Sequence, residues 1–192
     1  MESDTLARRL GTTTHLSPLL MKARWLGLSA PEDLERLAIR RGLRYYDGLG
    51  DSMLLREEAP RKELLAPTTD LAQFSNEELA LALLSMVLPH SQQRQRMGAA
   101  IMGAEGNSPA KIAALARHER SEMVVRHIAL CGRKVEPENA FWQDLLDRLP
   151  ETGTPEPDVL PHLTRFVAMT GFTRRGKETI MQWIRPTRPA AA

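Results

Sequence analysis

The chain of 192 residues is poor in two kinds of residue, because it has a single cysteine, Cys131, and only 5% aromatic residues. One cysteine excludes an internal disulfide bond and a cysteine-based zinc site. Its position in an apolar run predicts a buried thiol. Strands favour aromatic and β-branched residues, whereas leucine, alanine and methionine, which supply the apolar volume here, favour helices. The composition therefore predicts an all-α fold.

Long hydrophobic runs and a strong charge excess are also missing. The longest apolar stretch, residues 79–88, is too short to cross a bilayer, so we expect no membrane association. The net charge is +2, which is too small to indicate a polyanionic partner. Two of the first four residues, Glu2 and Asp4, are acidic, and no apolar segment typical of a secretory signal follows them. We therefore expect a cytoplasmic protein.

Glycine and proline punctuate the chain in a recurring way. Apolar runs end at Gly103, Gly132 and Gly171, and each is followed by a short polar turn and a second apolar run, with a fainter copy around Gly27. Glycine favours the left-handed backbone that closes a helix, and proline is favoured at the first position of the next one. The pattern predicts stacked antiparallel helical pairs, as an irregular α-helical repeat or an orthogonal bundle.

Local signals predict where several helices begin. Ser17–Pro18 and Ser108–Pro109 each read as an N-cap followed by proline, and Ser75 with Glu78 forms a capping box. The helix opened by Ser75 is apolar on nearly every side, which is typical of a core helix, and Pro89 is expected to end or kink it. The predicted core consists of nine apolar residues: Leu79, Leu83, Leu84, Val87, Ile112, Leu115, Val124, Ile128 and Leu145.

The helical pattern divides into two parts. Residues 68–74 are the predicted boundary between an N-terminal helical lobe, residues 1–74, and a repeat-like helical lobe, residues 75–186. Residues 187–192 are predicted to be a disordered tail.

The second lobe contains a recognisable pattern. The runs Leu115 to His118 and Val124 to Ala129 resemble α-helical repeats of the HEAT and leucine-rich-variant type, in which a valine–arginine pair often precedes a small apolar helix end. The resemblance covers about forty residues well and the flanking copies in outline. It implies stacked helical pairs.

Catalytic signals are few. The sequence has no nucleophile elbow, P-loop or dinucleotide fingerprint, and Gly48 and Gly50 lack the third glycine of a phosphate cradle. His118 and Glu122 are four positions apart, but a polar turn is expected between them and no second histidine completes a zinc motif. We expect no metal and no cofactor, and a non-catalytic role, while an enzyme stays an open alternative.

Basic residues are more frequent in the second half of the chain. Arg126 and Arg133 are seven positions apart, and so are Arg120 and His127. Guanidinium groups arranged in this way can hold phosphates or acidic protein surfaces, although solvated helix faces often carry such charges too. The residues predicted to bind a partner are Arg120, Arg126, His127, Arg133, Arg174, Arg175 and Lys177.

These observations predict a helical scaffold or adaptor that binds an acidic surface of another protein through an arginine-lined face. The alternative is a nucleic-acid-binding protein that uses the same basic residues, with residues 108–132 as a helix-turn-helix. Trp25, Trp142 and Trp183 are expected to be core anchors, and an exposed tryptophan would indicate an interface. The sequence does not predict the oligomeric state.

Overall fold

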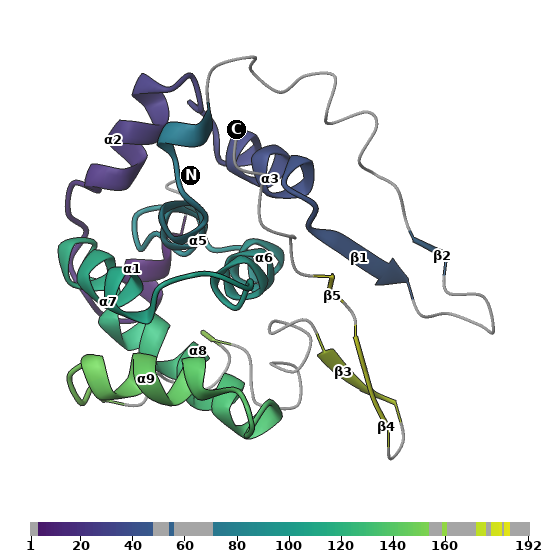
Figure 1. Cartoon of the computed structure of the whole chain (residues 1–192). Helices are drawn as coiled ribbons and strands as arrows, with labels where there is room; N and C mark the ends of the chain where they lie inside the picture. The colour runs from purple at the N-terminus through teal and green to yellow at the C-terminus, as the bar shows by residue number, and fades with distance from the viewer. Residues whose placement is uncertain are drawn as a thin grey trace.

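The structure is a computed structural model of the whole chain. It describes residues 4–47, 54–55, 71–153, 159–160, 172–175, 178–181 and 183–184, with side chains for 4–43, 72–153 and 159–160. The fold is all-α, as the composition predicts, and helices form its body (Figure 1). The α-helices of the described ranges are α1 (Leu6–Arg9), α2 (Pro18–Trp25), α3 (Pro31–Arg40), α5 (Asn76–Leu83), α6 (Gln92–Met102), α7 (Pro109–His118), α8 (Glu122–Val135) and α9 (Ala140–Arg148). A 3-10 helix, η1, spans Leu71–Gln73.

Short strands lie to one side of the helices (Figure 1). Strand β1 (Arg44–Asp47) pairs antiparallel with β2 (Leu54–Leu55) and with β5 (Trp183–Ile184). Strands β3 (Phe172–Arg175) and β4 (Glu178–Met181) form a separate antiparallel pair. The sequence did not predict these strands, which have two to four residues each.

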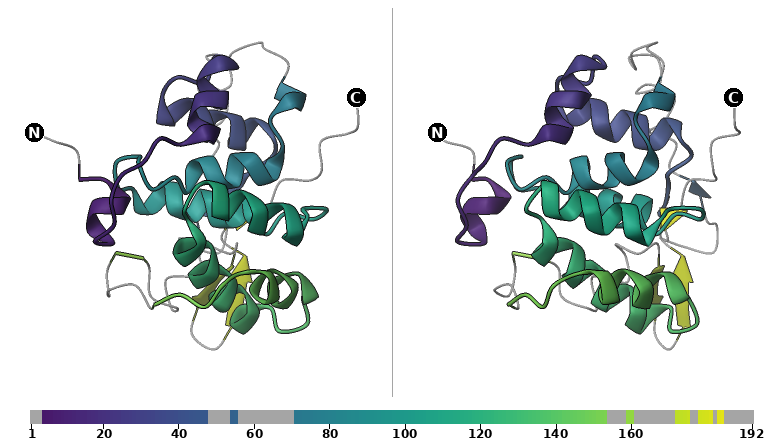
Figure 2. Two further views of the ribbon diagram at one scale, coloured as in Figure 1. Left: turned by 90° about the vertical axis from the view of Figure 1, so that its left-hand side faces the viewer. Right: turned by 60° about the vertical axis from the view of Figure 1, so that its left-hand side comes forward.

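Helix α5 lies at the centre of the helical body, where it packs against α2, α3, α6 and α7. Figure 2 shows α2 and α3 at one end of this body, α5, α6 and α7 in the middle, and α8 and α9 at the other end. Helices α7, α8 and α9 all pack against one another. The arrangement of the helices as repeats stays a prediction.

The predicted helix starts are confirmed. The hydroxyl of Ser17 accepts the Leu20 N–H at 3.2 Å at the start of α2, and Ser108 caps α7 in the same way. At the start of α5, Ser75 and Glu78 form the predicted capping box, with bonds of 2.8 and 3.2 Å. Local side-chain bonds of this kind satisfy amides that have no partner within the helix.

The predicted end of the core helix is wrong. Helix α5 ends at Leu83 rather than at Pro89. The residues after it pair with the N-terminal segment instead, since the Ala7 N–H donates to the Met86 carbonyl at 2.8 Å and the Leu6 N–H to the Leu88 carbonyl at 3.3 Å. A tertiary backbone pairing therefore replaces the last turns of the expected helix.

The predicted helix stop at Gly132 is also wrong, because α8 continues through it to Val135. Gly132 is needed for packing: a Cβ atom there would lie 2.4 Å from the ring of Trp142, closer than carbon atoms can approach. Gly103 does follow the end of α6, but its φ is −80° and not left-handed. Gly27, with φ of +86°, closes α2 in the expected way, and Gly171 lies outside the described residues.

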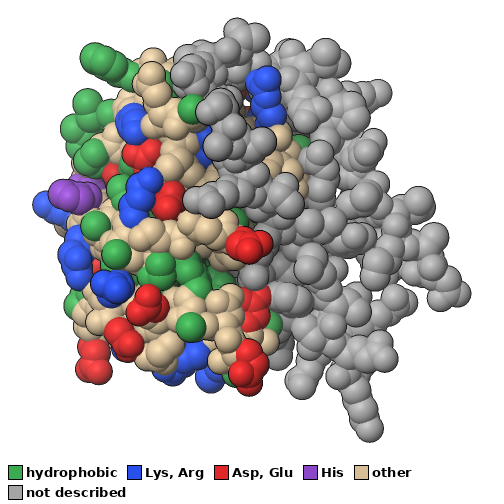
Figure 3. Space-filling model, in the orientation of Figure 1, with side chains coloured by type: hydrophobic (Ala, Val, Ile, Leu, Met, Phe, Trp, Pro, Cys, Tyr) green, Lys and Arg blue, Asp and Glu red, His purple; other side chains and the backbone are tan. Residues whose placement is uncertain are grey.

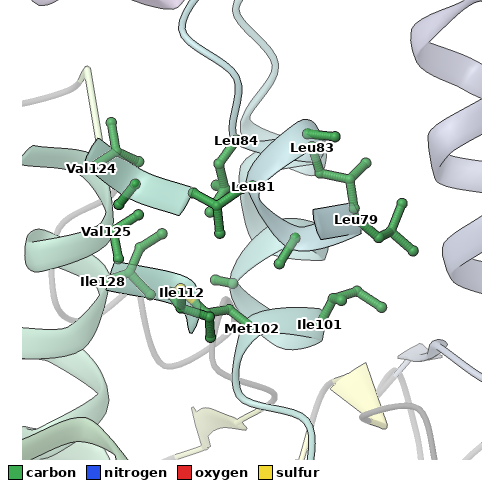
Figure 4. Packing of buried hydrophobic residues seen from close by; sticks show 14 of the residues in the cluster. Leu79, Leu81, Leu83, Leu84, Ile101, Met102, Ile112, Val124, Val125 and Ile128 are labelled. Carbon is green, nitrogen blue, oxygen red and sulfur yellow. The ribbon is translucent and has the colours of Figure 1, made fainter. Parts of the chain in front are cut away.

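Figure 4 shows part of the core, to which α5, α6, α7 and α8 contribute buried apolar residues. Seven of the nine predicted core residues are buried, and Val87 and Leu115 are half-buried. Cys131 is buried as predicted, and burial raises the pKa of its thiol to about 12. One hydrophobic cluster includes residues on both sides of the predicted boundary at residue 74. The lobes themselves stay a prediction, and residues 187–192 lie outside the described part.

Candidate functional site

Two of the arginines predicted to bind a partner make contacts within the chain. Arg126 is half-buried on α8, and its Nη1 donates to the Leu146 carbonyl on α9 at 3.5 Å. Arg133 is exposed, and its Nη1 donates to Gln143 Oε1 on α9 at 2.9 Å. Because α8 is continuous, these residues, seven positions apart, lie on one face of the helix, and that face borders α9.

The other predicted residues are dispersed. His127 is half-buried on α8, and Arg120 is exposed in the turn between α7 and α8. Arg174 and Arg175 lie in strand β3, where only the backbone is described. Lys177 lies outside the described residues.

The turn that carries Arg120 is fixed to the start of α2 by a buried carboxylate. Glu119 has 1% of its surface exposed. The Ser17 hydroxyl donates to Glu119 Oε2 at 2.5 Å, and the Leu19 N–H donates to Glu119 Oε1 at 2.8 Å. A carboxylate at a helix N-terminus satisfies free amides and opposes the positive end of the helix dipole. Arg120, which follows Glu119 with a left-handed φ of +51°, is therefore held beside the start of α2.

Helix α2 carries an apolar face that points away from the core. Leu19 and Ala23 are buried beneath the helix, whereas Leu16, Met21 and Trp25 are 74%, 46% and 92% exposed. Met21 and Trp25 are four positions apart and so share one face. We call Leu16, Met21 and Trp25 the α2 surface. Figure 3 shows hydrophobic side chains gathered at the upper left of the molecule, over α2.

This surface belongs to a helix that is held in place along its length. Glu119 binds its first turn, and further along Lys22 Nζ lies 2.7 Å from Glu78 Oε1 on α5. The same ammonium group lies 5.8 Å from the centre of the Phe74 ring. The exposure of Trp25 is therefore a property of a docked helix and not of a loose segment.

Cations point outward and carboxylates inward around the α2 surface. The Lys22 side chain is 40% exposed and its partner Glu78 is 15% exposed. Lys111 Nζ lies 3.3 Å from Glu77 Oε2, and these side chains are 45% and 12% exposed. Burial alone would raise the pKa of the Glu78 carboxyl, but hydrogen bonds from Lys22 and the Ser75 N–H outweigh it, so the pKa lies below its usual value.

We call Lys22, Lys111 and Arg120 the cationic rim. Lys22 and Lys111 meet at the start of α5, since their partners Glu78 and Glu77 are adjacent residues. Arg120 follows Glu119, whose carboxylate binds the start of α2. Figure 3 shows Lys and Arg side chains over α7, directly below the hydrophobic ones over α2. An apolar patch and a set of outward cations thus occupy the same side of the protein.

The described residues also form a cavity away from the α2 surface. An open cavity of about 680 Å³ is lined by α1, the segment that follows it, and the connection after α5. In the described part of the chain, the groups whose pKa is shifted are Arg41, Glu77, Glu78 and Cys131, and none of them lines this cavity. Nor does that part contain three His, Cys, Asp or Glu side chains grouped so that they could hold a metal ion.

No protein-family model matches the chain, and neither a curated protein nor a solved structure matches it. The likeness to HEAT and leucine-rich-variant repeats therefore stays a prediction. No helix in the described ranges is long and apolar enough to span a membrane. The fold defines the class of the protein as all-α, and its function has to be argued from its surface.

Sequence reasoning missed the α2 surface because it assigned Trp25 to the core. One signal was available. Residues 16–25 are apolar on more than one side and contain no acidic residue. A short helix at the edge of a fold can bury only one of those sides.

Proposed function

We propose that the protein is a recognition module that binds another protein through the α2 surface, with an acidic region of the partner against the cationic rim. The observation that carries the proposal is the 92% exposure of Trp25 on a helix that is docked along its length. Large exposed apolar groups are costly in water, so a rigidly held group of this kind indicates a contact site.

The side chains of the α2 surface are suited to this role. Tryptophan is enriched among the residues that dominate binding energy, and methionine adapts to the shape of a partner. Met21 and Trp25 are spaced as anchors of a helix that lies in an apolar groove of its partner. Leu16 extends the apolar contact beyond the start of α2.

The charges favour an acidic partner. The carboxylates of Glu77, Glu78 and Glu119 are covered by the protein's own groups, while Lys22, Lys111 and Arg120 keep exposed ends. A partner with carboxylates around an apolar groove would be attracted on approach and held in register. This arrangement supports the acidic protein partner expected from the sequence. Of the basic residues that the sequence predicted to bind it, Arg120 is the one that belongs to the cationic rim.

A capture experiment with variants tests the proposal. Wild-type protein, Trp25→Ala and the control Glu105→Ala, an exposed residue after α6, are immobilised and exposed to extract from the source cells. A partner retained by wild type and the control but lost by Trp25→Ala is identified, purified and titrated. Truncating a central tryptophan costs about 2 kcal/mol or more, so the Kd should rise at least ~30-fold.

Other outcomes would contradict the proposal. Equal retention by Trp25→Ala would exclude the α2 surface. Retention on heparin with a steep salt dependence, together with binding of a labelled oligonucleotide, would favour the nucleic-acid alternative. A wild-type dimer that Trp25→Ala converts to monomer in sedimentation would mean that a second copy of the chain covers this surface. Thermal melts of every variant check that the fold is intact.

A further inference from the structure

Gln95, in the first turn of α6, carries a buried amide. The residue is 2% exposed, and neither its Oε1 nor its Nε2 has a hydrogen-bond partner among the described residues. Burial of an amide without a partner opposes folding by an amount comparable to a lost hydrogen bond for each group. Such groups in folded proteins are usually satisfied by ordered water.

A small cavity lies next to this amide. It has a volume of about 10 Å³ and is lined by Gln95, Ser85, Ser91, His90 and several apolar residues. This is about the room that one water molecule needs. The walls include polar side chains, and apolar cavities stay dry whereas polar ones hold water.

The charged and aromatic groups of the wall already have partners. Arg94 Nε lies 3.3 Å from Glu35 Oε1, and Arg94 Nη1 donates to the Pro89 carbonyl at 3.0 Å. His90 Nε2 is 3.2 Å from the Val159 carbonyl. Ser91 Oγ accepts the Arg94 N–H at 3.2 Å, which leaves its hydroxyl proton free to donate to a guest. Gln95, with its unpartnered amide, therefore lines a cavity that offers at least one further hydrogen-bonding group.

We propose that this cavity is a binding site for a single water molecule, held by the Gln95 amide and a serine hydroxyl of the wall. The water connects the first turn of α6 to residues 84–91. That connection also pairs with residues 5–7 and, through His90, contacts Val159. The site thus stabilises the point where three segments of the chain meet, namely residues 84–95, residues 5–7 and Val159.

The substitution Gln95→Met tests the proposal by the sign of its effect. Methionine has nearly the same length but cannot hydrogen-bond to the water. If the water is bound, losing its main partner should lower the Tm by about 2–8 °C. Gln93→Met, the same change at an exposed position of the same helix, is the matched control and should leave the Tm nearly unchanged.

An unchanged or raised Tm for Gln95→Met would overturn the proposal, because removing an unsatisfied buried amide relieves its desolvation penalty. A crystal structure of the wild-type protein gives an independent measurement if the variant does not fold. A water peak about 2.7–3.2 Å from the Gln95 amide is expected. Absence of such a peak in well-ordered density would refute the site.

Discussion

Two tryptophans of this chain lie in opposite environments. Trp142 on α9 is fully buried, its ring lies against Gly132 of α8, and its Nε1 donates to Glu136 Oε2 at 2.7 Å. Trp25 on α2 is 92% exposed. Both lie at a junction between a turn and an apolar run, so the residue type and its immediate sequence do not distinguish them. The difference lies in what the rest of the fold provides: a glycine and a carboxylate for Trp142, and solvent for Trp25.

The same two regions differ in how they use positive charge. On α8, Arg126 and Arg133 donate to groups of α9 and tie the two helices together. Beside α2, Lys22 and Lys111 bind carboxylates beneath them and keep their outer ends in solvent. The comparison teaches that α8 and α9 use their tryptophan and arginine side chains for contacts within the protein. The tryptophan and lysine side chains of α2 instead keep exposed surface.

The largest expected difference in stability comes from replacing tryptophan with alanine in each region, in two separate variants. Trp142→Ala should lower the free energy of unfolding by about 3–5 kcal/mol, since it removes a large packed ring and the bond to Glu136. Trp25→Ala should change it by less than about 0.5 kcal/mol, because an exposed side chain contributes little. Urea denaturation of both variants and of wild type measures the difference.

The m-value serves as the control in that experiment, since a constant slope shows that the unfolding transition is comparable among the three proteins. A large decrease in the free energy of unfolding of Trp25→Ala would mean that the Trp25 ring packs against the protein in solution. The distinction between the two tryptophans, and with it the main support for the α2 surface, would then fail.

A smaller effect is expected where the two regions are joined. Glu119→Gln keeps the shape of the side chain but replaces one acceptor oxygen with a donor that faces the Ser17 hydroxyl or the Leu19 N–H. The loss of a hydrogen bond to a charged group should cost about 1.5–3 kcal/mol. Thermal and urea unfolding are the measurements, and Glu138→Gln, at an exposed position, is the matched control. Equal stability of the two variants would show that Glu119 does not hold α2.

The smallest expected effect is on the stability of a variant of the α8 arginines, and it tests whether these arginines or the α2 surface bind the partner. The double variant Arg126→Glu with Arg133→Glu should lower stability by about 1 kcal/mol, since one donor is exposed and the other makes a long bond. Lys134→Glu, at an exposed position of the same helix, is the control. Affinity for the captured partner should stay within a factor of about 3. Complete loss of binding without loss of stability would return the partner site to the arginine-lined face.

Much of the helical framework could be predicted because its signals are local. The serine caps and the proline at the first helical position act within four residues, so the starts of α2, α5 and α7 follow from the sequence. The apolar residues of α5 had to be buried because they surround the helix. Composition alone was sufficient for the fold class.

The remaining features depend on contacts between distant segments. Gly132 reads as a helix end until Trp142 is placed against it, and Glu119 reads as part of a solvated turn until the start of α2 covers it. Arg126 and Arg133 have a spacing that fits a partner and a neighbouring helix equally well. The apolar residues on several sides of α2 indicate that one side stays exposed, but whether Trp25 lies on that side depends on where the core packs against the helix.

The hydrogen bond between Ser17 and Glu119 joins residues that are 102 positions apart. During synthesis at about 5–20 residues per second, the anchor of α2 leaves the ribosome roughly 5–20 s after the helix itself. A long closed loop of this kind also slows folding, since its entropy is lost before the contact is gained. The α2 surface consequently takes its final orientation late, and a nascent or truncated chain that lacks residue 119 would present Trp25 on a helix whose first turn is not anchored.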